Sequence, residues 1–267
     1  MLKTQRQQKI IYEIEHKELV SVADLTTNLH VSEITIRRDL DELEKLGKIQ
    51  RVRGGARSND SALSEPPVVQ RQLDQIAEKD AIAARAVEFI EDGETIALES
   101  GSTAMALARK IAAQKWQNLQ VVTNSVPILN LLLRVRGINI VFAGGFVDAN
   151  ELCSYGKFTE ETLSHFHIAK YFCGCRSLDL RFGRTNEFQT GIEVGTVRAF
   201  AMASDKIFAL VDHTKFGRQY PLQLLPLEDI DIVITSTKAS AEVLAWLQEH
   251  GIETIAVSVD GKHHNRC

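Results

Sequence analysis

From residue 76 onward, short apolar runs alternate with stretches of helical periodicity, and no other feature constrains the fold of this chain as strongly. The apolar runs are Thr95–Leu98, Leu119–Thr123, Ile138–Phe142, Tyr171–Cys175, Ile207–Val211, Ile230–Thr235 and Thr254–Val259. The helical stretches are Ile76–Glu91, Ala104–Ala112, Val126–Arg134, Ile192–Ala203 and Ala239–His250. Short apolar runs alternating with helices are typical of strands that are buried on both faces. The pattern therefore predicts an α/β fold with a mostly parallel sheet covered by helices on both sides.

The N-terminal segment has a different pattern, with three helical stretches in close succession. Helices are expected over Thr4–Lys17 and over Val22–Leu29, the second beginning after Ser21. A third is expected from Ser32 to Leu46, because the Ser32 hydroxyl is suited to accept a hydrogen bond from a backbone N–H one turn on. Two short helices joined by so few residues are typical of a helix-turn-helix.

The third helix has two distinct faces. The face expected to be buried carries Ile36, Leu40 and Leu43. The opposite face carries Ile34, Arg37, Arg38 and Asp41. Two adjacent arginines on such a face suit the major groove of DNA, where arginine can donate two hydrogen bonds to guanine. The alternative is a solvated face with local ion pairs such as Arg38 to Glu42. The cap, the tight turn and the basic segment that follows favour a recognition helix.

Residues 48–55 alternate polar and apolar side chains before a glycine pair, which predicts a small hairpin, or wing. Five basic residues and no acidic residue occur from Lys45 to Asn59. Arg51 and Arg53 are expected to lie on one side of the hairpin, against DNA phosphates. The first 57 residues carry a net charge of +2 and the remainder −6. Only the N-terminal end is therefore expected to contact a polyanion.

Three segments of this region resemble the winged helix-turn-helix of the DeoR family of bacterial transcription regulators. They are Ser21-Val22-Ala23-Asp24-Leu25, Val31-Ser32-Glu33-Ile34-Thr35-Ile36-Arg37-Arg38-Asp39-Leu40 and Arg53-Gly54-Gly55-Ala56. The resemblance covers residues 3–58, with the helix-turn-helix motif at 20–39, and implies a double-stranded DNA operator as partner. The residues expected to contact DNA are Ser32, Glu33, Ile34, Thr35, Arg37, Arg38, Lys48, Arg51 and Arg53.

These residues are expected to contact DNA in different ways. Thr35, Arg37 and Arg38 are candidates for phosphate or base-edge contacts, and Ile34 for a thymine methyl group. Lys48 and the wing arginines are expected to position the protein on the backbone. One arm buries roughly 600–1,000 Å², whereas specific complexes bury roughly 1,000–2,500 Å². We therefore expect a homodimer or homotetramer on repeated or palindromic half-sites.

Residues 59–74 are interpreted as a linker, since they contain Pro66-Pro67 and lack a sustained helical period. The larger domain is expected over residues 75–260. Ligands of a parallel sheet lie beyond the carboxyl ends of its strands. Loops of small, hydroxyl, amide and charged residues follow four of the predicted strands: Glu99-Ser100-Gly101-Ser102-Thr103, Thr123-Asn124-Ser125, Ala143-Gly144-Gly145 and Asp212-His213-Thr214-Lys215-Phe216-Gly217. Each loop alone is equally typical of a cap or turn, but together they favour an anion site for a phosphorylated polyol.

The same stretches resemble the sensor domain of the DeoR family, which is similar in fold to ribose-5-phosphate isomerase. The resemblance spans residues 75–237 and implies a phosphorylated sugar as an effector that weakens DNA binding. The pocket residues that it implies are Ser100, Gly101, Ser102, Thr103, Thr123, Asn124, Ser125, Gly144, Gly145, Asp212 and Lys215.

The chain departs from the family pattern at three points. Glu99 replaces the usual aspartate, Val197 stands where a lysine is frequent, and Gly174-Cys175-Arg176-Ser177 replaces Gly-Ala-Asp-Gly. An acidic residue lost and Arg176 gained suggest a further effector contact and an acid-sugar phosphate as the hypothesis for the effector.

Two rival functional classes remain at this point. A sugar-phosphate isomerase with a DNA-binding appendage would use Glu99, Asp212 and Lys215 as base and electrophile. No acid/base pair with a clear spacing supports it, and a regulator needs only differential binding between two states. We therefore predict a regulator that is not an enzyme. A DNA-architectural protein conflicts with the acidic larger domain and its pocket-like loops.

Neither cofactor, metal nor membrane is expected. The cysteines are Cys153, Cys173, Cys175 and Cys267, and their spacing matches neither a disulfide framework nor a zinc site. His263, His264 and Cys267 at the tail are interpreted as a frayed terminus. No apolar run approaches the length of a membrane span, and no signal peptide precedes the first helix, so a reducing cytoplasm is expected.

Overall fold

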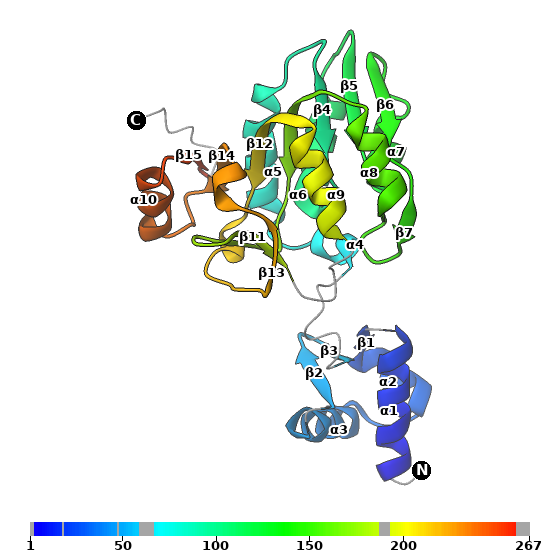
Figure 1. Ribbon diagram of the computed structural model, residues 1–267. Coiled ribbons are helices and arrows are strands. Elements are labelled where there is room, and N and C mark those ends of the chain that lie inside the picture. Colours follow the sequence, from blue (N-terminus) through cyan, green and yellow to red (C-terminus); the bar gives the residue numbers. More distant parts are fainter. Residues whose placement is uncertain (1–2, 18, 47, 59–66, 187–192, 260–267) are drawn as a thin grey trace. The chain divides into compact units, whose positions relative to one another are not determined.

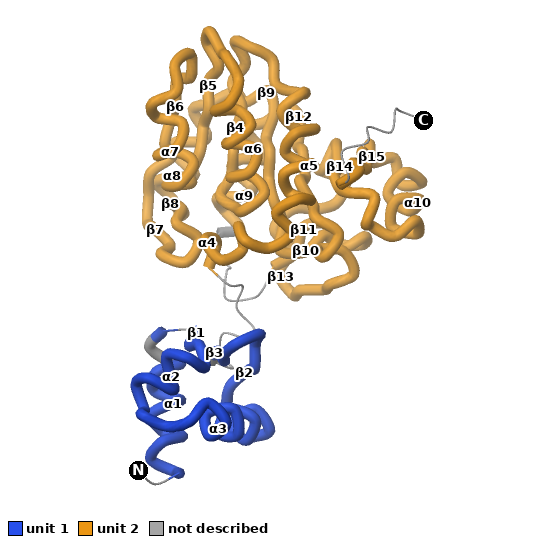
Figure 2. The backbone as a smooth tube through the Cα atoms, turned by 180° about the vertical axis from the view of Figure 1, so that it is seen from behind, with its two compact units in different colours: residues 1–66 blue, residues 67–267 orange. Residues whose placement is uncertain are grey.

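The chain divides into two compact units, Met1–Pro66 and Pro67–Cys267, drawn in different colours in Figure 2. The computed structural model describes residues 3–17, 19–46, 48–58, 67–186 and 193–259. The tail residues His263, His264 and Cys267 lie outside this range. No helix within the described ranges has both the length and the apolar character needed to cross a membrane.

Unit 1 combines three helices with a small antiparallel sheet (Figure 1). The helices are α1 (Lys3–Lys17), α2 (Val22–Leu29) and α3 (Glu33–Lys45). The strands, in spatial order, are β1 (Leu19–Ser21), β3 (Gly55–Ser58) and β2 (Ile49–Val52). The three predicted helices and the predicted hairpin are all found. The third strand, β1, was not predicted because a segment of three residues is too short to display an alternation.

The core of unit 1 contains the side chains whose spacing predicted it. Ile36 and Leu40 of α3 are fully buried, and Leu43 is 2% exposed. They pack with Ile10, Ile14, Val20, Val22, Leu25, Ile49 and Ala56. Each buried aliphatic side chain of the larger kind stabilises the fold by roughly 1.5–3 kcal/mol. This burial fixes which side of α3 faces outward.

Unit 2 is built on a seven-stranded sheet in which all neighbouring strands are parallel. In spatial order the strands are β15 (Glu253–Val257), β14 (Ile232–Ser236), β12 (Ser204–Leu210), β9 (Ile168–Cys173), β4 (Thr95–Leu98), β5 (Leu119–Thr123) and β6 (Ile138–Phe142). Every predicted apolar run corresponds to one of these strands, so the prediction of a mostly parallel sheet is confirmed.

Helices cover both faces of this sheet, as predicted. One face packs with α5 (Ile76–Ala86), α6 (Ser102–Ala112) and α7 (Val126–Leu132). The other packs with α8 (Lys157–Ser164), α9 (Glu193–Met202) and α10 (Ala241–Glu249). Strand alternation divides the sheet side chains between the two cores, since Ile96 and Leu98 belong to the first and Ala97 to the second.

Several short elements were not predicted, and helix α8 is one of them. They are α4 (Val68–Arg71), the hairpin β7 (Phe146–Asp148) and β8 (Cys153–Tyr155), the antiparallel sheet β10 (Ser177–Asp179), β11 (Gly183–Asn186) and β13 (Leu222–Leu225), and the 3-10 helices η2 (Val87–Phe89), η4 (His213–Lys215) and η5 (Leu227–Asp229). Each is too short for its periodicity to be read from the sequence.

The linker prediction, residues 59–74, needs correction at its C-terminal end. Residues 59–66 lie outside the described range, but residues 67–74 belong to unit 2. The N–H of Val68 donates to the carbonyl oxygen of Asn150 at 3.0 Å, and Arg71 forms an ion pair with Glu151. These contacts join α4 to the loop after β7, which a local reading of a proline-rich segment does not anticipate.

The strand order places a topological switch point between β4 and β9. The chain runs from β4 to β5 and β6 in one direction and then returns to β9 on the other side of β4. In open parallel sheets, ligands bind outside the carboxyl ends of the strands at such a point. In this chain that position is occupied by the loop that begins with Glu99 and by the loop that contains Arg176.

Candidate functional site

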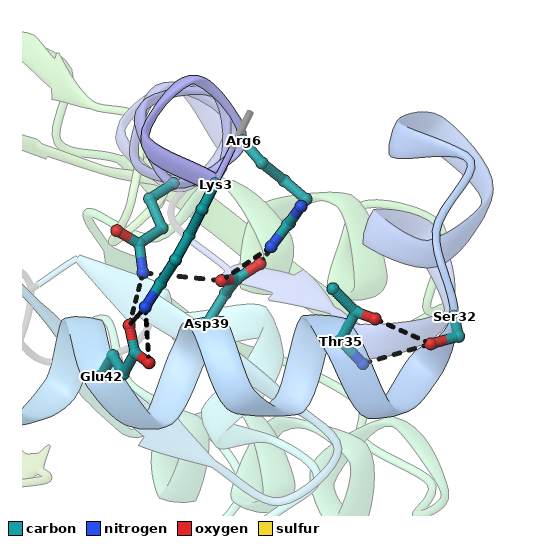
Figure 3. Close-up of polar contacts among 7 residues, drawn as sticks. Lys3, Arg6, Ser32, Thr35, Asp39 and Glu42 are labelled. Carbon is teal, nitrogen blue, oxygen red and sulfur yellow. Dashed lines mark hydrogen bonds and ion pairs between the residues drawn. The ribbon is translucent and has the colours of Figure 1, made fainter. Parts of the chain in front are cut away.

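The predicted recognition helix α3 begins at a side-chain cap. Ser32 has extended backbone angles, and its hydroxyl accepts a hydrogen bond from the backbone N–H of Thr35 at 3.3 Å (Figure 3). The Thr35 hydroxyl lies 2.8 Å from that of Ser32. Opposite the buried face, Ile34 is 72% exposed. A large aliphatic side chain left in water at the start of a helix is consistent with a partner at that position.

Basic side chains from other parts of unit 1 meet the carboxylates of α3. Arg6 donates two hydrogen bonds to Asp39, at 2.5 and 3.2 Å (Figure 3). Lys3 of α1 lies 2.7 Å from Glu42 Oε1, and the Gln7 amide donates to Glu42 Oε2 at 2.9 Å. The Lys3 ammonium lowers the pKa of Glu42, so this carboxyl is ionised at neutral pH. Helix α1 thus neutralises two of the acidic residues of α3.

The two predicted DNA-contacting arginines of α3 differ in their ion pairing. Arg37 is exposed and pairs with Glu33 one turn earlier, at 2.5 Å. Arg38 is also exposed, and within the described ranges it makes no ion pair. The alternative expected local ion pairs on this face. One such pair forms between Arg37 and Glu33, but Arg38 does not pair with Glu42, whose carboxylate is held by Lys3 and Gln7.

The basic residues of the wing also differ in exposure and in their contacts. Lys48 and Arg53 are exposed, with Arg53 in the turn between β2 and β3. The Arg51 side chain is only 22% exposed, and its guanidinium lies 3.6 Å from Asp41 of α3. Its backbone N–H donates to the Glu44 carboxylate at 2.8 Å. Arg51 therefore differs from Arg53, since it also holds β2 against α3.

In unit 2 a small hollow lies beside the switch point. It is shallow and partly open to solvent. It is lined by Glu99, Ser100, Asn124, Cys153, Ser154, Tyr155, Thr196 and Val197. The Ser100 N–H donates to Asn124 Oδ1 at 3.0 Å, and the Asn124 amide donates to the Ser154 carbonyl at 2.9 Å. Two of the predicted effector residues, Ser100 and Asn124, thus meet here.

Sequence reasoning missed the lining residues that come from β8 and α9. Ser154 and Tyr155 belong to a strand of three residues, and Thr196 lies in the first turn of α9. The Thr196 hydroxyl accepts a hydrogen bond from the Gly156 N–H at 3.1 Å, which ties these two elements together. No local pattern marks these residues, because they are brought together only by the tertiary fold.

Several predicted effector residues use their polar groups within the fold. The Thr123 hydroxyl donates to the Leu98 carbonyl at 2.6 Å and accepts from the Ser125 N–H at 3.1 Å. The Ser125 hydroxyl in turn caps α7. Ser102 and Thr103 are buried in the first turn of α6, after Gly101. Gly144 and Gly145 follow β6, and a side chain at Gly145 would collide with Thr159 and the Tyr155 carbonyl. Packing alone therefore accounts for a glycine at position 145.

Glu99 takes part in a buried ion pair at the edge of the hollow. Arg184 of β11 donates to both carboxylate oxygens, at 2.5 and 2.8 Å, and the Tyr171 hydroxyl donates to Oε2 at 2.5 Å. Burial lowers the pKa of Arg184, but the nearby Glu99 charge helps to raise it, and the net pKa lies above its ordinary value. The guanidinium therefore stays charged. The isomerase hypothesis assigned Glu99 a role as base. That carboxylate is instead occupied by three hydrogen bonds.

A second polar cluster lies beyond β12 and β14. The Glu78 carboxylate accepts from the Ser236 hydroxyl at 2.6 Å and from the His213 N–H at 2.7 Å, and His213 Nδ1 lies 2.7 Å from it. The Asp212 carboxylate caps η4. Burial lowers the pKa of Lys79, while Asp212 raises it. Sequence reasoning missed Glu78 and Lys79 because α5 shows an ordinary amphipathic period.

Two more predicted effector residues lie outside the hollow. Lys215 is in η4 beside Asp212, and its charge lowers the pKa of Lys79. The Arg176 guanidinium lies over the ring of Tyr220, 5.3 Å from its centroid. Neither side chain lines the hollow around Ser100. The structure therefore divides the predicted effector residues between a hollow at β4 and β5 and a charged cluster at β12. Within the described part of the chain, no group of three or more histidine, cysteine or acidic residues is arranged to hold a metal.

A winged helix-turn-helix followed by an α/β domain with a polar strand edge defines a class, the DNA-binding transcription regulators with a sensor domain. Comparison with known families gives the particular family. Residues 6–62 match the DeoR-like helix-turn-helix domain, and residues 74–237 match the DeoR C-terminal sensor domain. The chain belongs to the DeoR family of transcription regulators.

Two relatives are similar along nearly their whole length. The glycerol-3-phosphate regulon repressor of Escherichia coli K12 is 32% identical over 95% of this chain and 98% of its own. The transcriptional regulator GolR of Listeria innocua is 30% identical over 94% and 98%. Ribose 5-phosphate isomerase A from Neisseria gonorrhoeae is 21% identical over 53% of each chain, with a TM-score of 0.38. So distant a likeness supports no inference about function.

Proposed function

We propose that this protein is a transcriptional repressor of a carbohydrate-catabolism operon, released from its operator by a phosphorylated sugar or acid-sugar effector. The observation that carries the proposal is the outer face of α3, where Ile34 is exposed and Arg38 has no ion-pair partner in the described ranges. The repressors and regulators to which the chain is similar support the same role.

In this proposal α3 enters the major groove. Arg38 and Arg37 reach base edges or phosphates, with Ser32, Glu33, Ile34 and Thr35 at the start of the helix. Lys48, Arg51 and Arg53 position the wing on the backbone. Two arms on repeated half-sites require a homodimer or homotetramer, which acts in the bacterial cytoplasm. If each arm neutralises about four phosphates, the log–log salt slope of a dimer is about −7.

The effector in this proposal binds at the carboxyl edge of the sheet. Free N–H groups at the start of α6, the hydroxyl-rich hollow and the cation Lys215 suit a phosphate group. A regulator needs a ligand that binds its two states with different affinity, without turnover. The Glu99–Arg184 pair favours sensing over catalysis, since it occupies the candidate base.

Two linked experiments test the proposal. Duplexes are first selected from random DNA with the full-length protein, and binding of a selected duplex is measured by fluorescence anisotropy. Arg38→Ala and Arg37→Ala are expected to abolish this binding while leaving thermal stabilisation by effectors intact. Failure to enrich any duplex would remove the DNA-binding proposal.

The effector is sought by thermal unfolding with a panel of sugar phosphates and acid-sugar phosphates. A ligand at about 100 times its Kd should stabilise the protein by roughly 2.7 kcal/mol and release the selected duplex. Preference for neutral-sugar phosphates, with Arg176→Ala indifferent, would exclude the acid-sugar form of the proposal. Conversion of any panel member to another sugar phosphate would restore the isomerase alternative.

A further inference from the structure

The acidic residues of α3 raise a problem for a helix that meets DNA. Five carboxylates lie within its thirteen residues: Glu33, Asp39, Asp41, Glu42 and Glu44. Together they add negative charge to a helix that meets phosphates, and those three or four residues from an arginine compete for it. Glu42 is the strongest competitor for Arg38, because residues four apart on a helix are neighbours on its surface.

Side chains of helix α1 reduce both the competition for the arginines and the repulsion of phosphates. Its first turns bring Lys3 and Gln7 to Glu42, and Arg6 to Asp39 (Figure 3). Both carboxylates are thereby directed toward α1 and satisfied there. The two contacts differ in exposure. Asp39 is 2% exposed and Arg6 13%, whereas the Glu42 and Lys3 side chains are 44% and 56% exposed.

We propose that the first two turns of α1 form a neutralising clamp, in which Arg6 fixes the orientation of α3 and Lys3 with Gln7 withholds Glu42 from Arg38. This inference rests on the proposed function, since it concerns the arginine that the proposal assigns to DNA. It assigns Lys3 and Gln7 a positioning role that acts through Glu42. Neither residue needs to touch DNA itself.

The clamp makes a prediction that direct DNA contact does not. Removing Lys3 and Gln7 together frees Glu42 to pair with Arg38 and weakens operator binding. Removing the Glu42 charge as well takes away the competitor and restores binding. If Lys3 instead contacted a phosphate, Glu42→Gln would relieve the same repulsion in the wild type and in the double variant, whereas the clamp predicts that it changes binding only in the double variant. Both Lys3 and Glu42 are exposed enough for their removal to leave the core of unit 1 intact.

The test uses the full-length protein and a fluorescent duplex selected from random DNA by the wild type. An exposed i,i+4 ion pair corresponds to about a twofold equilibrium effect, so two arms give about fourfold. Lys3→Met/Gln7→Met is expected to weaken binding of the duplex about fourfold. Adding Glu42→Gln is expected to return the affinity to within about twofold of the wild type. The matched control is Lys9→Met, which removes an exposed lysine of the same helix and is expected to leave binding unchanged.

A readout without DNA separates failure of the clamp from failure of the proposed function. In NMR spectra the Arg38 side-chain Nε–Hε resonance should shift in Lys3→Met/Gln7→Met and return in the triple variant. An unmoved resonance overturns the clamp even if the protein binds DNA normally. A moved and restored resonance supports it even if the wild type selects no duplex. A triple variant that binds DNA as weakly as the double variant also overturns the inference.

Discussion

Carboxylates are held differently in the two units, and the difference corresponds to what each unit is proposed to do. In unit 1, Glu42 is met at the surface by a cation from another helix, and the buried Asp39 is met by Arg6, which is 13% exposed. In unit 2, Glu99 and Glu78 are almost completely buried and are satisfied by several donors each. Surface neutralisation leaves neighbouring cations available to a partner, whereas buried neutralisation fixes the shape of a site.

The two arginine–carboxylate pairs are built alike and differ mainly in the cation. Arg6 and Arg184 each donate to both oxygens of one carboxylate. Both carboxylates are buried, since Asp39 is 2% exposed and Glu99 is 6% exposed. The Arg6 side chain is 13% exposed and Arg184 is 8% exposed, and Tyr171 adds a third hydrogen bond to Glu99. Water should reach Asp39 more easily than Glu99 once the arginine is removed, so we expect the larger cost in unit 2.

The largest effect is expected for Arg184→Met. It leaves the Glu99 carboxylate buried without its cation, which should reduce the free energy of unfolding by about 3–5 kcal/mol. Urea denaturation followed by tryptophan fluorescence measures this change, since both tryptophans belong to unit 2. The double variant Arg184→Met/Glu99→Gln should lose less than Arg184→Met alone. Equal losses would show that the charge pairing does not matter.

A smaller loss is expected for Arg6→Met in unit 1. The substitution removes hydrogen bonds to a charged group, which contribute about 1.5–3 kcal/mol. Hydrogen exchange of the α3 amides should accelerate, while amides of the seven-stranded sheet stay protected. Lys9→Met is the control and should change neither. A loss as large as that of Arg184→Met would contradict the proposed difference between the two pairs.

A third prediction concerns the acid stability of unit 2. Burial raises the pKa of Glu78, but hydrogen bonds from Ser236 and His213 outweigh it, and the pKa lies below its usual 4.5. A carboxyl whose folded pKa is depressed stabilises the fold above its unfolded pKa and loses that contribution as the pH falls through the folded pKa. The thermal unfolding temperature of the wild type should therefore fall as the pH drops below about 4.5. Glu78→Gln should be less stable at neutral pH and show a weaker decline.

The smallest effect is expected for the exposed pair of Glu33 and Arg37. Pairs of this kind contribute about 0.3–0.5 kcal/mol, so Glu33→Ala should barely change the stability of unit 1. Because the proposal places Glu33 at the DNA, the same substitution should weaken binding of a selected duplex by up to about twofold per arm, even though it frees Arg37. Anisotropy titrations measure this change. Stronger binding instead would show that Glu33 only restrains Arg37 and does not contact the DNA.

Periodic features of the sequence predicted most of the fold. Strands β4, β5 and β6 match their predicted bounds because buried apolar runs flanked by polar residues are unambiguous. The caps Ser21 and Ser32 were also predicted, because a cap and its helix are close together in the sequence. The elements that were missed, such as β1 and β13, are stabilised by partners distant in the sequence.

The candidate site was less predictable, for a physical reason. Ser100 and Asn124 were anticipated because carboxyl ends of parallel strands meet at one edge. Arg184 lies 85 residues from Glu99 in sequence, and nothing local announces that the two pair. The same holds for Lys3 and Glu42, 39 residues apart. Spacing rules describe neighbours along a helix or strand, and these partners are neighbours only after folding.

The close contact at Gly55 has a consequence for how this protein can evolve. A β-carbon at this position would collide with the Val20 carbonyl, and the Val22 N–H donates to the Gly54 carbonyl at 2.8 Å. The wing is therefore joined to the start of α2 and cannot be exchanged without it. A saturation library at position 55 should retain glycine alone. New operator specificities in this lineage must then arise by changing side chains on an unchanged frame.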